Sequence, residues 1–276
     1  MVGIREQTIM SKSALLFAFN NPKFNYYEMA VATAKRINHF LNLPVTIVTN
    51  SESLPVKQDY EFDKVLLVST DSNNTRDQVV WINKGRYRAF DLSPYDETIL
   101  LDTDYMINSD NLLKTFDTYQ DLCCHDTTSF VMHPGVPQEV LSAYSFNTLW
   151  ATVVTFKKTN RAKQIFQCLE MVQNNYDHYA DIHSFVGGIY RNDYALTLAL
   201  RIANGHTDNK QDIIPWNLLH VGKNTTVYRN SDDEFNTEYT VMYDNWQRGK
   251  IRKEYITLTN TDFHVMNKPN FMELIA

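Results

Sequence analysis

The alternation of short apolar runs with a helical stripe is the feature of this sequence that most constrains its fold. Residues 14–19, 45–49 and 64–69 are apolar or β-branched runs of the length that buried strands have. A helix is expected between the first two runs, from Tyr26 until Pro44 interrupts it, because apolar residues recur there at steps of three and four: Ala30, Ala34, Ile37 and Leu41. A strand, a helix and two further strands in this order indicate a parallel sheet.

The alternation continues through the middle of the chain. Strands are expected at residues 98–101 and 149–156, and helices at residues 77–90, from Asn160 onward, and from Arg191 to Gly205. The polar segments 177–188, 204–212 and 224–236 are expected to be loops. This order predicts an α/β protein with a mixed, mostly parallel sheet and helices on both faces. The 276 residues are expected to form a single domain, residues 13–276, after an N-terminal extension of residues 1–12.

The charge balance excludes a protein that coats nucleic acid along its whole surface. Acidic residues outnumber basic residues by 32 to 26, so the formal net charge is -6. Two basic clusters are the local exceptions, and each is expected to be a solvated face or a contact for an anionic partner: Lys157, Lys158, Arg161 and Lys163, and Arg248, Lys250, Arg252 and Lys253.

Nothing in the sequence predicts export or a membrane segment. The first residues lack the apolar stretch of a secretory signal, and no apolar run approaches the roughly 20 residues that cross a bilayer. The 3 cysteines form no C-x-x-C pair, so neither a disulfide framework nor a cysteine zinc site is expected. We therefore expect a cytoplasmic protein without a membrane partner, present as a monomer or a weak homo-oligomer.

Asp102-Thr103-Asp104 is the motif that points to chemistry. With 21 aspartates among 276 residues, about 1.6 D-x-D triplets are expected by chance, so the triplet alone carries little weight. Its position matters more, because it follows the apolar run 98–101, and ligands of open α/β sheets bind beyond the carboxyl ends of the strands. Two carboxylates at about 4 Å repel by roughly 4 kcal/mol at an effective dielectric constant of about 20, which favours a bound cation. The alternative is that Asp102 caps a turn and Asp104 faces water.

A second candidate group lies near the end of the chain, at His264 and Lys268. Two carboxylates suit Mg²⁺ or Mn²⁺, with phosphate oxygens and water as the remaining ligands. An imidazole from His264 would favour Mn²⁺, and Lys268 would hold a departing phosphate as a point charge. Together these groups suit a reaction in which charge develops on a leaving diphosphate. The alternative for His264 is an ordinary hydrogen-bonded histidine of the core or the surface.

These motifs, in this order, resemble the GT-A glycosyltransferases, and most of all the retaining family 8 type. In that family a strand-end D-x-D and a late H-x-x-G-x-x-K motif bind Mn²⁺ and the diphosphate of a nucleotide-sugar, typically a UDP-sugar. The resemblance spans residues 13–270 in the order of elements, and it implies the GT-A fold with a metal site at Asp102, Asp104 and His264. The chain departs from the motif because Asn267 replaces the glycine and Lys268 comes two positions early.

The resemblance also implies positions that contact the nucleotide-sugar. They lie at the first two strand ends, ahead of the D-x-D strand and within the two motifs: Phe19, Asn20, Thr49, Asn50, Lys84, Arg88, Thr103 and Lys268. A purely structural role for Arg88 is an equal alternative.

Two further segments are similar to sugar-handling segments of the family. They imply catalytic or orienting roles for Asn147, which precedes a predicted strand, and for Asn192 and Asp193, which open a predicted helix. The segment at Trp150 could take the register of Asn147 instead. Asn192 and Asp193 could also act only as groups that stabilise the start of the helix.

The sequence therefore predicts a metal-dependent, retaining glycosyltransferase that moves a sugar from a nucleotide-diphosphate sugar to an acceptor hydroxyl. Residues 17–49 resemble small glycosyltransferases of tailed bacteriophages, which implies 5-hydroxymethylcytosine in phage DNA as the acceptor, with glucosyl or arabinosyl transfer. The alternative acceptors are a glycan, a protein or a small molecule. The alternative to an enzyme is a non-catalytic nucleotide-binding module.

Overall fold

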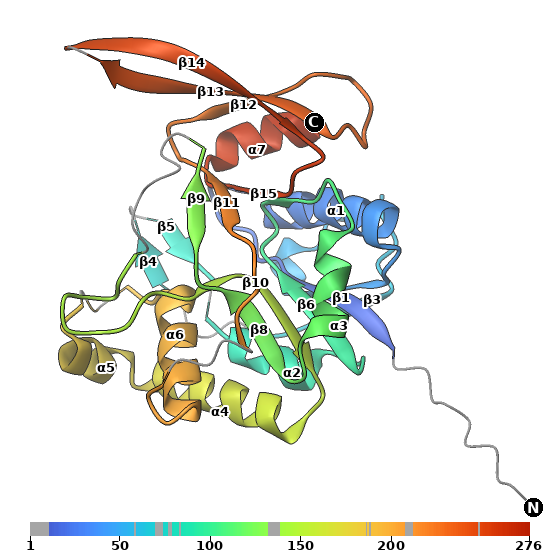
Figure 1. Cartoon of the computed structure of the whole chain (residues 1–276). Helices are drawn as coiled ribbons and strands as arrows, with labels where there is room; N and C mark the ends of the chain where they lie inside the picture. Colours follow the sequence, from blue (N-terminus) through green and yellow to red (C-terminus); the bar gives the residue numbers. More distant parts are fainter. Residues whose placement is uncertain are drawn as a thin grey trace, which may run out of the picture.

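A six-stranded sheet forms the centre of the computed structural model, which describes residues 11–57, 59–69, 74–76, 79–82, 84–131, 139–185, 187, 189–207, 212–247 and 249–276. The strand order is β3-β2-β1-β6-β10-β8, which corresponds to Lys64–Leu67, Val45–Thr49, Lys12–Phe17, Glu97–Leu101, Trp150–Lys157 and Leu122–His125. The first four strands pair in parallel, and β10 runs antiparallel to both β6 and β8 (Figure 1). The predicted mixed sheet is confirmed.

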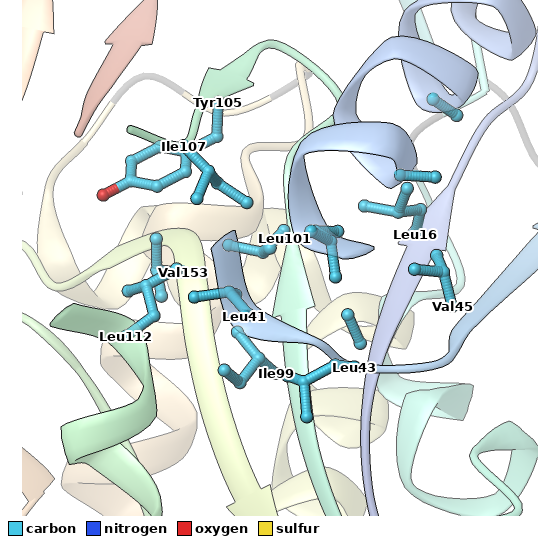
Figure 2. Close-up of a cluster of buried hydrophobic side chains, with 14 of the residues drawn as sticks. Leu16, Leu41, Leu43, Val45, Ile99, Leu101, Tyr105, Ile107, Leu112 and Val153 are labelled. Carbon is cyan, nitrogen blue, oxygen red and sulfur yellow. The ribbon is translucent and has the colours of Figure 1, made fainter. Parts of the chain in front are cut away.

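Helices cover both faces of this sheet, as predicted. They are α1 (Tyr26–Arg36), α2 (Ala89–Leu92), α3 (Lys114–Thr118), α4 (Asn160–Asn174), α5 (Tyr176–His183) and α6 (Asn192–Ala203), whereas α7 (Lys268–Ile275) packs against the smaller sheets. On one face Leu16 and Leu101 pack in a buried cluster with α1 and α3 (Figure 2), whereas Leu15 and Leu100 pack on the other face with α2, α4 and α6. Successive strand residues point to opposite faces, and apolar side chains of these strands lie on both, so the sheet needs both layers of helices. Within the described part of the chain, no helix has the length and apolar character that a membrane span requires.

Two smaller sheets connect the second half of the chain to this core. The first has the order β7-β15-β11-β9, which corresponds to Tyr105–Met106, Phe263–Val265, Leu218–Val221 and Thr128–Phe130. The second consists of β12 (Thr226–Arg229), β13 (Glu238–Gln247) and β14 (Lys250–Thr259). Phe271 and Leu274 of α7 pack with Val241 and Phe263 in a third buried cluster. The far end of the β13–β14 ribbon extends beyond α7 at the top of Figure 1.

The predicted helix over residues 77–90 is wrong. The described part of this region forms a hairpin of β4 (Asn74–Arg76) and β5 (Val79–Trp81), then a 3-10 turn at Arg86–Arg88 that leads into α2. The β-branched pair at residues 79 and 80 favours a strand over a helix. Gly85 has a φ of 100°, a left-handed conformation that interrupts any helix before Arg86. Asp77, the expected start of the helix, lies outside the described residues.

The segments expected to be loops also differ from the structure. Much of residues 177–188 belongs to α5, and β12 lies within residues 224–236. The β13–β14 ribbon was not predicted at all, because its strands mix polar and apolar residues without a strong signal. The helix α4 begins at Asn160 as expected, but its N-cap is Thr159 rather than Asn160, since the Thr159 hydroxyl accepts the Ala162 amide at 3.1 Å. Residues 1–10, 208–211 and Arg248 lie outside the described part.

His125 at the end of β8 is a buried histidine that makes the fold sensitive to acid. Its side chain has no exposure to solvent, and burial lowers its pKa from 6.5 to about 3. The unfolded chain therefore binds a proton that the folded chain does not, and stability is lost as the pH falls below 6.5 towards 3. For one such group the loss at pH 5 is about 2 kcal/mol.

His125→Phe is expected to reduce the decrease in unfolding free energy between pH 7 and pH 5 by about that 2 kcal/mol. Urea unfolding at the two pH values measures it. His178→Phe, on the exposed side of α5, serves as the control that should leave the pH dependence unchanged. An equal pH dependence in wild type and His125→Phe would contradict this account.

Candidate functional site

The D-T-D segment leaves β6 at the wall of a cavity. Every residue of β6 is buried, and the amide of Asp102 continues its pairing by donating to a carbonyl of β10 at 2.9 Å. The chain then turns into β7, which pairs antiparallel with β15, the strand that carries His264. The amide of Val265 donates to the carbonyl of Asp104 at 3.0 Å. Backbone pairing of these short strands therefore brings the middle of the chain and its tail together.

Asp102, Asp104 and His264 form a cluster with the composition of a metal site. One ligand atom of each residue lies within 4.8 Å of those of the other two. Nε2 of His264 is 3.3 Å from Oδ1 of Asp104. Two carboxylates and one imidazole are a donor set that Mn²⁺ accepts, so the residues fit the metal that the resemblance implies.

Two basic side chains contact this cluster. The ammonium of Lys268 contacts Oδ2 of Asp104, and the guanidinium of Arg86 contacts Oδ1 of Asp102. Arg86 is buried, and it also donates to the carbonyl of Ala151 at 2.6 Å. Each carboxylate thus has its own counter-charge, which explains how two acids can lie side by side in this wall.

Burial and neighbouring charges shift the pKa values of the cluster in different directions. Burial raises the pKa of Asp102, and the nearby Arg86 offsets only part of that effect. Burial also opposes ionisation of Asp104, but Lys268 and His264 outweigh it, so the pKa of Asp104 lies well below its usual range. Burial opposes protonation of His264, yet Asp104 outweighs it and raises the pKa of His264. Asp104 is therefore the carboxylate that stays ionised.

The cavity beside the cluster has a volume of about 1110 Å³, and charged and aromatic groups line it together. Phe24, Tyr26 and Trp81 form an aromatic group in its wall, with ring centres 5.9 to 6.2 Å apart. The ammonium of Lys268 lies 5.6 Å from the ring centre of Tyr26. The cationic groups of the cluster and the aromatic group are therefore neighbours in one cavity.

Several predicted contacts line this cavity: Phe19, Lys84, Thr103, Asn192, Asp193 and Lys268. Asp193 is held firmly, because its Oδ1 accepts the amide of Ala151 at 2.9 Å and its Oδ2 is 3.4 Å from Arg191. Asn147 is exposed and does not line the cavity. The register at Trp150 and Ala151, the alternative from the sequence, is the one that reaches the cavity wall.

Most of the residues predicted to contact the donor at the ends of β1 and β2 instead form hydrogen bonds within the protein. Asn20, Thr49 and Asn50 do not line the cavity. The Thr49 hydroxyl donates to the carbonyl of Ala18 at 2.6 Å. The side-chain amide of Asn20 donates to the carbonyl of Ser53 at 3.3 Å, and the side-chain oxygen of Asn50 accepts the Ser53 amide at 3.1 Å. These polar side chains stabilise the two turns after β1 and β2.

Arg86 and His220 belong to the site although the sequence did not single them out. The resemblance implied Arg88, but the 3-10 turn after Gly85 brings Arg86 into the cavity wall, which Arg88 does not line. Gly85, directly before Arg86, is the one sequence signal that could have indicated a turn at this point. His220 reaches the site through strand pairing, with its Nδ1 2.9 Å from Nδ1 of His264. The spacing of residues along the sequence could not have predicted this contact of His220.

Solved structures that align with this chain include three glycosyltransferases. The glycosyltransferase GlyE of Streptococcus pneumoniae TIGR4 aligns at 13% identity over 68% of this chain and 43% of that chain, with a TM-score of 0.41. The galactosyltransferase LgtC in complex with donor and acceptor sugar analogs aligns at 14% identity over 68% of this chain and 70% of that chain, with a TM-score of 0.45. Mouse xyloside xylosyltransferase 1 in its apo form aligns at 12% identity over 77% of this chain and 85% of that chain, with a TM-score of 0.43.

The alignment with GlyE spans less than half of that protein's length. No protein-family profile and no curated protein matches the chain. Identity of 12 to 14% with partial superposition transfers no residue's role to this chain.

Proposed function

We propose that this chain is a metal-dependent glycosyltransferase of the GT-A type that uses a nucleotide-diphosphate sugar as its donor. The observation that carries the proposal is the convergence of Asp102, Asp104 and His264 within 4.8 Å in the wall of a large cavity. These three side chains would hold Mn²⁺ or Mg²⁺, which when bound neutralises negative charge on a diphosphate.

The rest of the cavity has the chemistry that a nucleotide-sugar requires. Arg86 and Lys268 bring positive charge to the two carboxylates, and Lys84 adds a further positive charge to the cavity wall, as a diphosphate needs. Phe24 and Trp81 offer aromatic surface for a planar base. The volume of about 1110 Å³ exceeds the roughly 300 to 1,000 Å³ of ordinary ligand pockets, which leaves room for a donor and part of an acceptor. A UDP-sugar is the donor we propose.

Residues of this chain would orient the sugar and balance the negative charge of the departing diphosphate. Lys268 would hold the departing diphosphate, and Asp193, held by the amide of Ala151, would orient the sugar through hydrogen bonds. We assign a retaining course to the reaction. The bond from the anomeric carbon to the phosphate oxygen breaks, the acceptor oxygen bonds to the same face of the sugar, and the departing phosphate takes the acceptor's proton.

The acceptor is proposed as a molecule with a free hydroxyl group, and 5-hydroxymethylcytosine in DNA is the specific case to test. The two basic clusters of the sequence do not join into one stripe for DNA, since Arg161 belongs to α4 and Lys250 and Lys253 belong to β14, and these two elements lie at opposite ends of Figure 1. Mass spectrometry of a hydroxymethylated oligonucleotide, incubated with the protein and UDP-sugars, decides the matter. An added glucosyl or arabinosyl mass supports DNA as the acceptor, and an unchanged mass removes it.

Donor binding and turnover test the proposed activity itself. Mn²⁺ and a UDP-sugar together are expected to raise the thermal unfolding midpoint more than either alone, because both bind only the folded state. Release of UDP should depend on Mn²⁺ and stop with EDTA. Undiminished release by Asp102→Ala would contradict the metal role, and failure of every nucleotide-sugar to bind would contradict the donor.

A further inference from the structure

A second histidine lies directly behind His264 in the small sheet. Parallel pairing of β11 with β15 sets His220 opposite His264, and the two ring centres are 5.0 Å apart. Nδ1 of His220 is 2.9 Å from Nδ1 of His264, which is hydrogen-bonding distance. The side chain of His220 has no exposure to solvent. The contact is therefore a buried bond between two imidazoles.

The two ends of the His264 ring face different partners. Its Nε2 faces Asp104 at 3.3 Å, and its Nδ1 faces His220. Only one of the two Nδ1 atoms in this contact can carry the hydrogen. A histidine that binds a metal through Nε2 keeps its proton on Nδ1 and donates it to a neighbouring acceptor. His220 must then accept at Nδ1 and carry its own proton on Nε2.

The surroundings of His220 show that the fold maintains this arrangement against a cost. The ring of Trp150 is 4.6 Å from that of His220, and Trp150 pairs in register with His125. Among the described residues, the Nε2 atom of His220, both ring nitrogens of His125 and Nε1 of Trp150 have no hydrogen-bond partner. Buried polar atoms without partners destabilise a fold, so each of them calls for an explanation.

We propose that His220 is a positioning residue that accepts the Nδ1 hydrogen of His264 and so directs Nε2 of His264 towards the cation held with Asp102 and Asp104. This inference rests on the proposed metal-dependent function. His220 does not touch the cation or the substrate, and it acts only by fixing the tautomer and the orientation of the ligand. Loss of such a partner typically weakens metal binding about 10- to 100-fold, and we expect a loss of this size when His220 is replaced.

Two substitutions at one position separate the hydrogen bond from the packing. His220→Phe keeps a ring of similar shape and removes the acceptor. His220→Asn places a side-chain oxygen near the position of Nδ1 and restores an acceptor. Mn²⁺ affinity, measured by electron paramagnetic resonance titration, is expected to fall about 10- to 100-fold in His220→Phe and to recover most of that loss in His220→Asn.

A readout in the metal-free protein makes the test independent of turnover. Nitrogen-15 NMR of the histidine rings should show a proton on Nδ1 of His264 and on Nε2 of His220. Thermal unfolding and circular dichroism of the metal-free proteins check that both variants are folded before their Mn²⁺ affinities are compared.

The outcomes distinguish this inference from the proposed function. Failure of the wild-type protein to bind Mn²⁺ would overturn the metal-dependent function, and this inference with it. Normal Mn²⁺ binding by wild type and equal affinity in His220→Phe would overturn only the role of His220. A proton on Nδ1 of His220 in the metal-free protein would overturn it as well.

Discussion

Asp104→Asn is expected to lower donor turnover by about three orders of magnitude and to abolish measurable Mn²⁺ binding. Asp104 contacts both His264 and Lys268, and it is almost completely buried. Its replacement removes one ligand of the proposed cation and also leaves the charge of Lys268 without its partner. This one substitution therefore affects both a proposed metal ligand and Lys268, the lysine proposed to hold the diphosphate.

The measurement is release of UDP from a UDP-sugar at saturating Mn²⁺, with metal affinity measured in parallel. Asp117→Asn is the matched control, because the side chain of Asp117 is 84% exposed on α3. Circular dichroism should show that both variants are folded. Turnover by Asp104→Asn within a factor of ten of wild type would refute the assignment of Asp104 as a metal ligand.

Arg86→Met is expected to reduce the unfolding free energy of the metal-free protein by about 3 kcal/mol. Arg86 is 8% exposed, and its guanidinium contacts both Asp102 and the carbonyl of Ala151. Its removal leaves the carboxylate of Asp102 beside Asp104 without a counter-charge and leaves a buried carbonyl without that donor. Saturating Mn²⁺ should restore part of the loss, because a bound cation supplies the missing charge.

Arg88→Met provides the comparison, since Arg88 lies in the same 3-10 turn but does not line the cavity. Its substitution should change the unfolding free energy by no more than about 0.5 kcal/mol. Urea unfolding with EDTA and with Mn²⁺ measures both variants. Equal losses for Arg86→Met and Arg88→Met would show that the contact with Asp102 has no special importance.

The main sheet could be predicted because its strands are buried on both faces. β1, β2 and β6 are short apolar runs that only a layered α/β arrangement can cover, and the stripe of α1 has a clear helical period. Prediction failed where local signals were mixed or weak. The region before α2 has both β-branched residues and helical spacing, and Gly85 decides between them through a conformation that favours glycine.

The prediction of site residues also succeeded at some strand ends and failed at others. Asp102 and Asp104 could be selected because a strand end places two carboxylates at the edge of a sheet, and the structure brings His264 to them. Asn20, Thr49 and Asn50 lie at strand ends too, but their side chains bond to the backbone of the two turns that follow β1 and β2. A strand end thus predicts proximity to the site, whereas the hydrogen bonds that a side chain has already made determine whether it faces the cavity.

The layered α/β architecture and the position of two acids after a buried strand follow from the amino-acid order, because hydrophobic periodicity and strand ends are properties of neighbouring residues. Which other groups complete the site depends on how distant segments pack together. Arg86 contacts Asp102 because a turn redirects the chain, and His220 contacts His264 because β11 and β15 pair. Such contacts depend on how distant segments of the chain turn and pair, so they cannot be predicted from residue spacing along the sequence.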